Sequence, residues 1–67
     1  MNVIDLVNKI PVSDIIRIII DDPDEGELVM DLTCDDLCIE HSELLYATVI
    51  DHGALEDEVS GIWILID

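Results

Sequence analysis

Carboxylates are the side chains in this sequence with the most evident chemistry. The stretch DDPDEGELVMDLTCDD, residues 21–36, holds eight of them and no Lys or Arg. Carboxylates gathered in this way can bind a cation, share a proton in catalysis, or present negative charge to a partner. Each of these chemistries requires particular neighbouring residues, so each can be checked against the sequence.

A calcium loop of the EF-hand type is not expected here. When Gly26 is placed at the sixth position of such a loop, Asp21 takes the first position, and Pro23 takes the third. The twelfth position is then Leu32 instead of the glutamate that closes the loop, and no flanking helices are expected. We expect a solvated acidic turn that binds cations only weakly.

A structural zinc site is not expected either. The side chains that could ligate zinc are those of Cys34, Cys38, His41 and His52, and their C-x3-C-x2-H spacing fits no pattern that fixes a tetrahedron. We expect no metal or other cofactor, and two free thiols. The N-terminal MNVID lacks the features of a signal peptide, so the expected compartment is the reducing cytoplasm.

Catalysis by paired carboxylates needs a pocket that separates the pKa values of the two groups. A 67-residue chain built on a single sheet has little room for such a pocket. The sequence also shows no Ser-His or Cys-His arrangement and no Gly-rich phosphate loop. We therefore expect that the protein is not an enzyme.

The charge balance is the most unusual property of the chain. Seventeen acidic residues face two basic ones, which gives a net charge of −15, yet 51% of the residues are apolar and a folded domain is expected. This charge disfavours nucleic acid and anionic membranes as direct partners and favours a basic protein surface. The longest apolar run, IIRIII, is too short to cross a membrane.

The charge density is comparable with that of duplex DNA. A compact chain of this length has a radius of gyration of about 11 Å and a diameter of roughly 28 Å. Duplex DNA carries about one charge per 1.7 Å, or about 16 over that length. Residues on one face of a strand are roughly 6.6 Å apart, so carboxylates on strands and turns can form rows similar to phosphates.

The elements that would position these carboxylates follow from the spacing of apolar residues. Residues 3–9 are predicted to form a short amphipathic helix, capped by Asn2 and ended by Pro11. DIIRIIID and ELVMDLT alternate as strands do, and DDPDEG between them is a turn, so a hairpin is predicted. Ile16, Ile18 and Ile20 would share one face of it.

The second half of the chain is predicted to add two strands. Thr33 can cap one helical turn that carries Asp35 and Asp36. LLYATVID is predicted to be a third strand, HGALEDEVSG a loop, and IWILID the closing strand. Residues 1–67 are thus predicted to form one α+β domain, a small antiparallel sheet of about four strands with one short N-terminal helix packed on a face.

The second face of this sheet is not clearly polar. Turn regions, a partner or a second copy in a homodimer would have to cover it. The residues expected on it are Ile15, Ile19, Val29, Trp63 and Leu65.

Two acidic clusters are the candidate partner-binding residues. The first follows the predicted hairpin and consists of Asp21, Asp22, Asp24, Glu25, Glu27 and Asp31, continuing to Asp35 and Asp36. The second consists of Glu56, Asp57 and Glu58 in the predicted loop. We expect the hairpin set to dominate, because a strand and a tight turn hold its carboxylates in place.

In character, the chain resembles small phage-encoded anti-CRISPR proteins that mimic DNA, including those that act on type I-C Cascade. The features that carry the resemblance are the leading NVIDLVNKIP helix, the IIRIII strand and the late pair LLYATVID…GIWILID, all within a very acidic chain. The resemblance implies an inhibitor that occupies the basic DNA-binding or PAM-reading site of an effector complex. The alternative is an acidic structural or antitoxin-like module that neutralises a basic protein without mimicking DNA.

Overall fold

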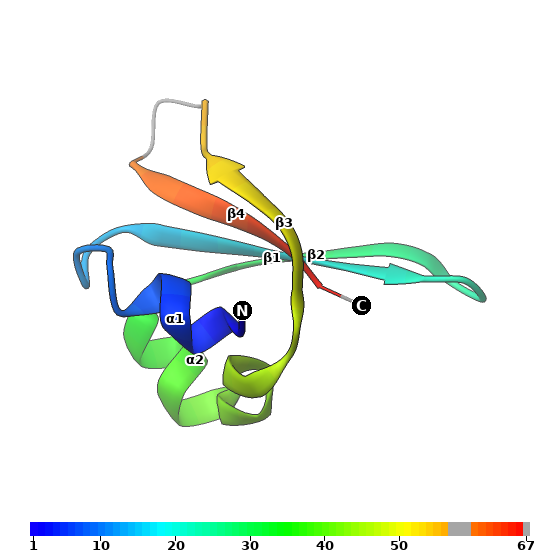
Figure 1. Ribbon diagram of the computed structural model, residues 1–67, viewed down its shortest axis with the longest axis horizontal. Helices are drawn as coiled ribbons and strands as arrows, with labels where there is room; N and C mark the ends of the chain where they lie inside the picture. The colour runs from blue at the N-terminus through cyan, green and yellow to red at the C-terminus, as the bar shows by residue number, and fades with distance from the viewer. Residues whose placement is uncertain (57–59, 67) are drawn as a thin grey trace.

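The computed structural model describes residues 1–56 and 60–66 and has two layers. A four-stranded sheet forms one layer, and short helices that cover one of its faces form the other (Figure 1). This architecture confirms the predicted α+β class. In chain order, the elements are α1 (Val3–Val7), β1 (Ile15–Asp22), β2 (Gly26–Leu32), α2 (Cys34–Glu40), the 3-10 helix η1 (Ser42–Tyr46), β3 (Val49–Ala54) and β4 (Gly61–Ile66).

The N-terminal helix α1 is shorter than the predicted span of residues 3–9. It begins after Asn2, whose amide donates a hydrogen bond of 2.9 Å to the Asp5 carboxylate. Its last turn tightens, because the Lys9 amide bonds to the carbonyl oxygen of Leu6, three residues earlier, at 3.0 Å. Five helical residues are enough to bury one apolar face against the sheet.

The predicted β1–β2 hairpin is confirmed, with Asp22 opposite Gly26 at its end. One carboxylate oxygen of Asp22 accepts hydrogen bonds from the amides of Asp24, at 2.9 Å, and Glu25, at 3.4 Å. Gly26 has a φ of 88°, which L side chains rarely adopt. The three-residue connection is therefore stabilised by one acidic side chain and by a glycine that closes the turn.

The sheet is mixed, and the prediction of a wholly antiparallel sheet was wrong in this respect. Its strand order is β2-β1-β4-β3; β1 is antiparallel to β2 but parallel to β4. The helical segment carries the chain from one edge strand to the other, and β4 then returns between β3 and β1. The alternation of residues in a strand shows which side chains share a face of the sheet, but it does not show which strands are neighbours. The sequence pattern therefore could not reveal that β1 and β4 are a parallel pair.

The segment between the two hairpins is more helical than predicted. Thr33 accepts a hydrogen bond of 3.2 Å from the Asp36 amide, as predicted, but α2 continues for seven residues. The predicted third strand, LLYATVID, was wrong in its first half, because Leu44 and Leu45 lie in η1 and β3 begins only at Val49. His52, predicted to lie in a loop, belongs to β3.

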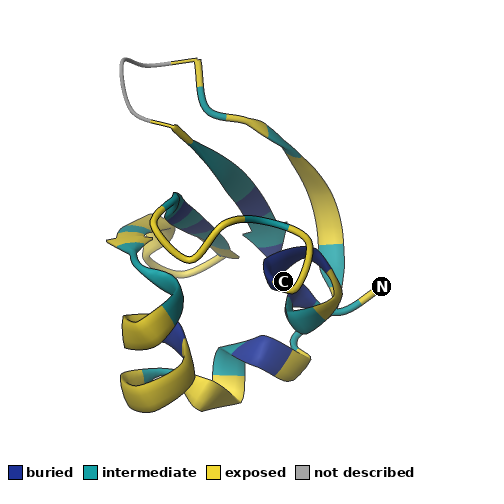
Figure 2. Cartoon of the chain, turned by 90° about the vertical axis from the view of Figure 1, so that its left-hand side faces the viewer, coloured by how far each residue is buried: buried dark blue, intermediate teal, exposed yellow. Residues whose placement is uncertain are grey.

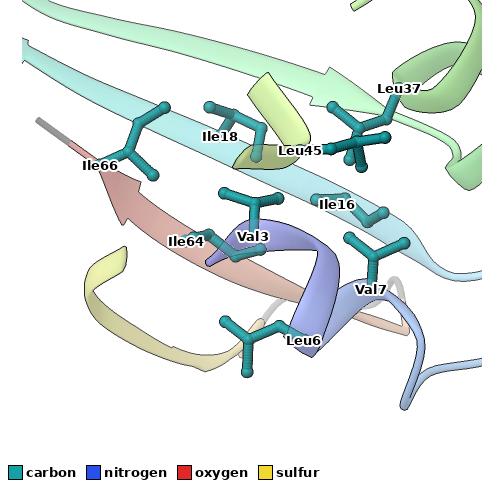
Figure 3. Close-up of a cluster of buried hydrophobic side chains, with 9 residues drawn as sticks. All are labelled: Val3, Leu6, Val7, Ile16, Ile18, Leu37, Leu45, Ile64 and Ile66. Atoms are coloured by element: carbon teal, nitrogen blue, oxygen red, sulfur yellow. The ribbon is translucent and has the colours of Figure 1, made fainter. Parts of the chain in front are cut away.

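A single apolar cluster lies between the sheet and the helices (Figure 3). Buried segments of strand and helix face one another, whereas the connecting loops are largely exposed (Figure 2). In the part of the chain that the structure describes, nine side chains are buried: Val3, Leu6 and Val7 of α1, Ile16 and Ile18 of β1, Leu37 of α2, Leu45 of η1, and Ile64 and Ile66 of β4. Among the described residues no charged side chain is buried, so the acids are left at the surface.

Candidate acidic binding surface

The richest group of carboxylates lies at the tip of the β1–β2 hairpin. Five occur within seven residues, and the tip extends away from the helices and past the last described pairing with β4, which joins Ile20 to Ile66 (Figure 1). We call this tip the acidic arm. Its carboxylates are those of Asp21, Asp22, Asp24, Glu25 and Glu27.

The arm carboxylates have two different roles. Asp22 is partly buried, and its side chain is used by the turn, as described above. The other four side chains are exposed, two at the end of paired strands and two at the apex. The arm therefore presents four carboxylates to solvent, and the fifth, that of Asp22, helps to fix the backbone of the turn.

The electrostatics of the arm work against folding. Asp21 and Glu27 are directly opposite in the antiparallel register, where Cβ atoms are about 4.5–5.5 Å apart and like charges destabilise. In the described part of the chain, no ion pair involves an arm carboxylate. A solvated face that served only solubility would not need two carboxylates directly opposite each other.

Asp31, predicted with the hairpin set, lies apart from the arm and has a different environment. It is four residues from Glu27 on the same face of β2, or roughly 13 Å along the strand. Both of its carboxylate oxygens accept hydrogen bonds from the Arg17 guanidinium, at 2.8 and 3.1 Å. These bonds lower the pKa of Asp31, and they compensate its charge.

The remaining candidates fall on other parts of the surface. Asp35 and Asp36 are exposed in the first turn of α2, at the opposite end of β2 from the arm. Glu56 is exposed after β3, whereas Asp57 and Glu58 lie outside the described residues. Of the nine predicted residues that the structure describes, it thus gathers five into one group and places the other four apart from it.

One acidic residue that the prediction omitted lies on the same sheet face as Asp21. Asp51 is exposed on β3 opposite Leu65, and its carboxylate accepts a hydrogen bond of 2.8 Å from the His52 amide. Its position follows the irregularity in register between Val49 and Asp51. A bulge of this kind reverses the alternation of faces, so simple periodicity could not place the residue.

Within residues 1–56 and 60–66, no group of three or more His, Cys, Asp or Glu side chains is placed to hold a metal ion. Cys34 and Cys38 are free thiols. Burial and, as a smaller effect, a hydrogen bond with Cys38 raise the pKa of the Cys34 thiol, which favours its protonated form.

None of the helices in the described residues has the length and apolar character needed to cross a membrane. Comparisons with protein families, curated proteins and solved structures found no match.

The opposed pair in the arm gives a first prediction. Asp21→Asn or Glu27→Gln should raise the free energy of unfolding by roughly 0.2–1 kcal/mol, because each change removes a cross-strand repulsion. The gain should be largest at low salt and shrink as the Debye length falls. Asp24→Asn, at the apex and outside the pair, is the matched control. Denaturant unfolding that shows no gain over this control would contradict the opposed-charge description.

The ion pair of Asp31 gives a second prediction. A carboxyl group whose pKa is lower in the folded protein stabilises the fold at pH values above its ordinary pKa, which is 3.8 for Asp31. This contribution is lost as the pH falls through the pKa of the folded state. The difference in unfolding free energy between the wild type and Asp31→Asn should therefore be constant above pH 3.8 and shrink below it. Urea titrations across this range test the expectation; a difference independent of pH would refute it.

Proposed function

We propose that this protein inhibits a DNA-binding protein complex by presenting its carboxylates in place of DNA phosphates. The observation that carries the proposal is the acidic arm, which projects four exposed carboxylates without a described cationic partner. Projection allows the arm to enter a groove, and the lack of internal pairing leaves its charge available to the lysines and arginines of a DNA site.

The dimensions of the molecule support this proposal. Its longest extent is 33 Å and its net charge is −15, or about one charge per 2.2 Å along that axis. Duplex DNA carries about one per 1.7 Å. A basic channel shaped for DNA would therefore encounter a similar amount of negative charge over a similar length, and its field would accelerate the encounter.

The proposed mechanism is competitive occupancy. The arm enters the basic site, charge-assisted hydrogen bonds form to its carboxylates, and duplex DNA is excluded from the same side chains. The resemblance drawn from the sequence makes a type I CRISPR effector complex in the cytoplasm of a phage-infected cell the target class to examine first. DNA itself is not a partner, because both molecules are strongly negative.

An acidic module that neutralises a basic protein without imitating DNA is the second candidate. The separation of the carboxylates into the arm, the start of α2 and the end of β3 favours it, because charge spread over several surfaces does not reproduce one phosphate row. The two candidates differ in one respect: a mimic and DNA exclude each other from the target, whereas a neutralising module need not compete.

Clustered neutralisation of the arm tests the proposal. The probe is a purified type I CRISPR effector complex with labelled duplex DNA, and the readout is the concentration of this protein that blocks DNA binding at several salt concentrations. The arm variant carries Asp21→Asn, Asp24→Asn, Glu25→Gln and Glu27→Gln, with Asp22 kept for the turn. The control removes the same charge elsewhere, by Asp36→Asn, Glu40→Gln, Glu43→Gln and Glu56→Gln.

The arm variant should block DNA at least about tenfold less well and with a shallower salt dependence, since each lost phosphate-like contact removes part of the salt slope. The control should stay near wild type, and single Asp→Asn changes should cost little. Lys substitutions in the arm should weaken the block more than Asn, because they add repulsion. A folded arm variant with wild-type strength and salt slope would show that the arm does not imitate DNA.

A further inference from the structure

The sheet face opposite the helices carries apolar side chains on both sides of the Arg17–Asp31 ion pair, and no described helix covers them (Figure 1). Alternation and register place its side chains on β1, β2 and β4, where most are partly buried and Val29 is 51% exposed. We call this surface the open face. Its apolar residues are Ile15, Ile19, Val29, Trp63 and Leu65.

Trp63 gives the open face a broad, flat contact area. It lies opposite Gly53 of β3, and a Cβ atom added to that glycine would come within 2.8 Å of the indole Nε1 and 2.9 Å of two ring carbons. The indole therefore lies across the neighbouring strand, over the glycine. An aromatic ring held in this way is the type of side chain that most often dominates protein interfaces.

The border of the open face is acidic. Asp21 and Glu27 follow the apolar residues at the arm end, and Asp51 lies beside Leu65 on β3. Arg17 lies within the face, between Ile15 and Ile19 on β1 and opposite Trp63, and both carboxylate oxygens of Asp31 accept hydrogen bonds from it. The face thus combines apolar side chains around an ion pair with negative charge at the arm end and on β3, which is complementary to an apolar surface bordered by lysine or arginine.

A second copy of the chain fits this face poorly. Each copy has a net charge of −15, and its border brings further carboxylates to the contact. At a short distance this repulsion opposes the gain from apolar burial, and salt only partly screens it. A basic partner removes the repulsion and replaces it with attraction.

We infer that the open face is a docking surface for a protein segment with an apolar centre and basic edges, and that Val29 and Trp63 are its main contacts. The open face adjoins the arm at Asp21 and Glu27, but the inference does not depend on the imitation of DNA. Contacts made here are mainly apolar and depend weakly on salt, whereas those of the arm are charged and depend on it strongly.

Trp63 is the sole tryptophan, so its fluorescence reports on the open face directly. The probe is an amphipathic helical peptide of leucine and lysine, compared with a peptide of the same length and lysine count in which serine replaces leucine. At physiological salt, the leucine peptide should shift the emission of Trp63 to the blue, and the serine peptide should not. Both should bind more weakly to the four-residue arm variant.

Two neighbouring substitutions give the matched comparison. Val29 and Leu28 are 51% and 48% exposed and lie on opposite faces of the same edge strand. Val29→Thr should weaken binding of the leucine peptide roughly fivefold at every salt concentration. Leu28→Thr should change it little. Thermal unfolding confirms that both variants fold.

Three results would overturn the inference. One is an equal blue shift with both peptides, and another is an equal effect of the two substitutions. The third is a dimer in analytical ultracentrifugation that dissociates in Val29→Thr, which would make a second copy the occupant of the face. Failure of this inference can be told apart from failure of the proposed function. The peptide results do not depend on whether the protein competes with DNA for a target.

Discussion

The fold depends on the burial of apolar side chains, nine of them among the described residues, between one sheet face and a layer of short helices. Burying a Val, Leu or Ile side chain contributes about 1.5–3 kcal/mol, whereas an exposed ion pair contributes about 0–1 kcal/mol. With two basic residues against seventeen acidic ones, ion pairs can do little to hold this chain together. The isoleucines of β1 and β4 and the helical residues above them must therefore outweigh the repulsion by packing alone.

That constraint explains where the charge lies. No described charged side chain is buried, and the densest carboxylates lie on a hairpin tip that reaches past the described end of β4. At the tip, water and salt screen the repulsion, so the arm can carry charge without disrupting the core. The same position makes the charge accessible to a partner. The apolar open face then offers a second kind of contact, which does not weaken in salt as the arm does.

Local chemistry made much of this structure predictable from the sequence. The alternation of Ile16 and Ile18 predicted the core face of the hairpin, and the DDPDEG turn predicted the hairpin on which the arm is built. Non-local and ambiguous features were missed. The parallel pairing of β1 with β4 is set by the path of the chain through the helices. Leu44 and Leu45 belong to a short apolar run that suits a strand or a helix equally.

The separation of Asp31 from the arm was also beyond the sequence pattern. Its ion pair with Arg17 joins residues fourteen positions apart, and only the hairpin register brings them together. The sequence placed Glu27 and Asp31 in one acidic cluster, but it could not show that the charge of Asp31 would be compensated by Arg17.

In the proposed complex, the arm occupies the place of DNA phosphates. The most direct measurement is a pair of cryo-electron microscopy structures of one target complex, with this protein bound and with duplex DNA bound, superposed on the target. If the arm replaces DNA phosphates, the carboxylates of Asp21, Asp24, Glu25 and Glu27 contact the same lysine and arginine side chains that hold phosphates in the DNA complex. An arm that points into solvent while DNA remains bound would contradict it.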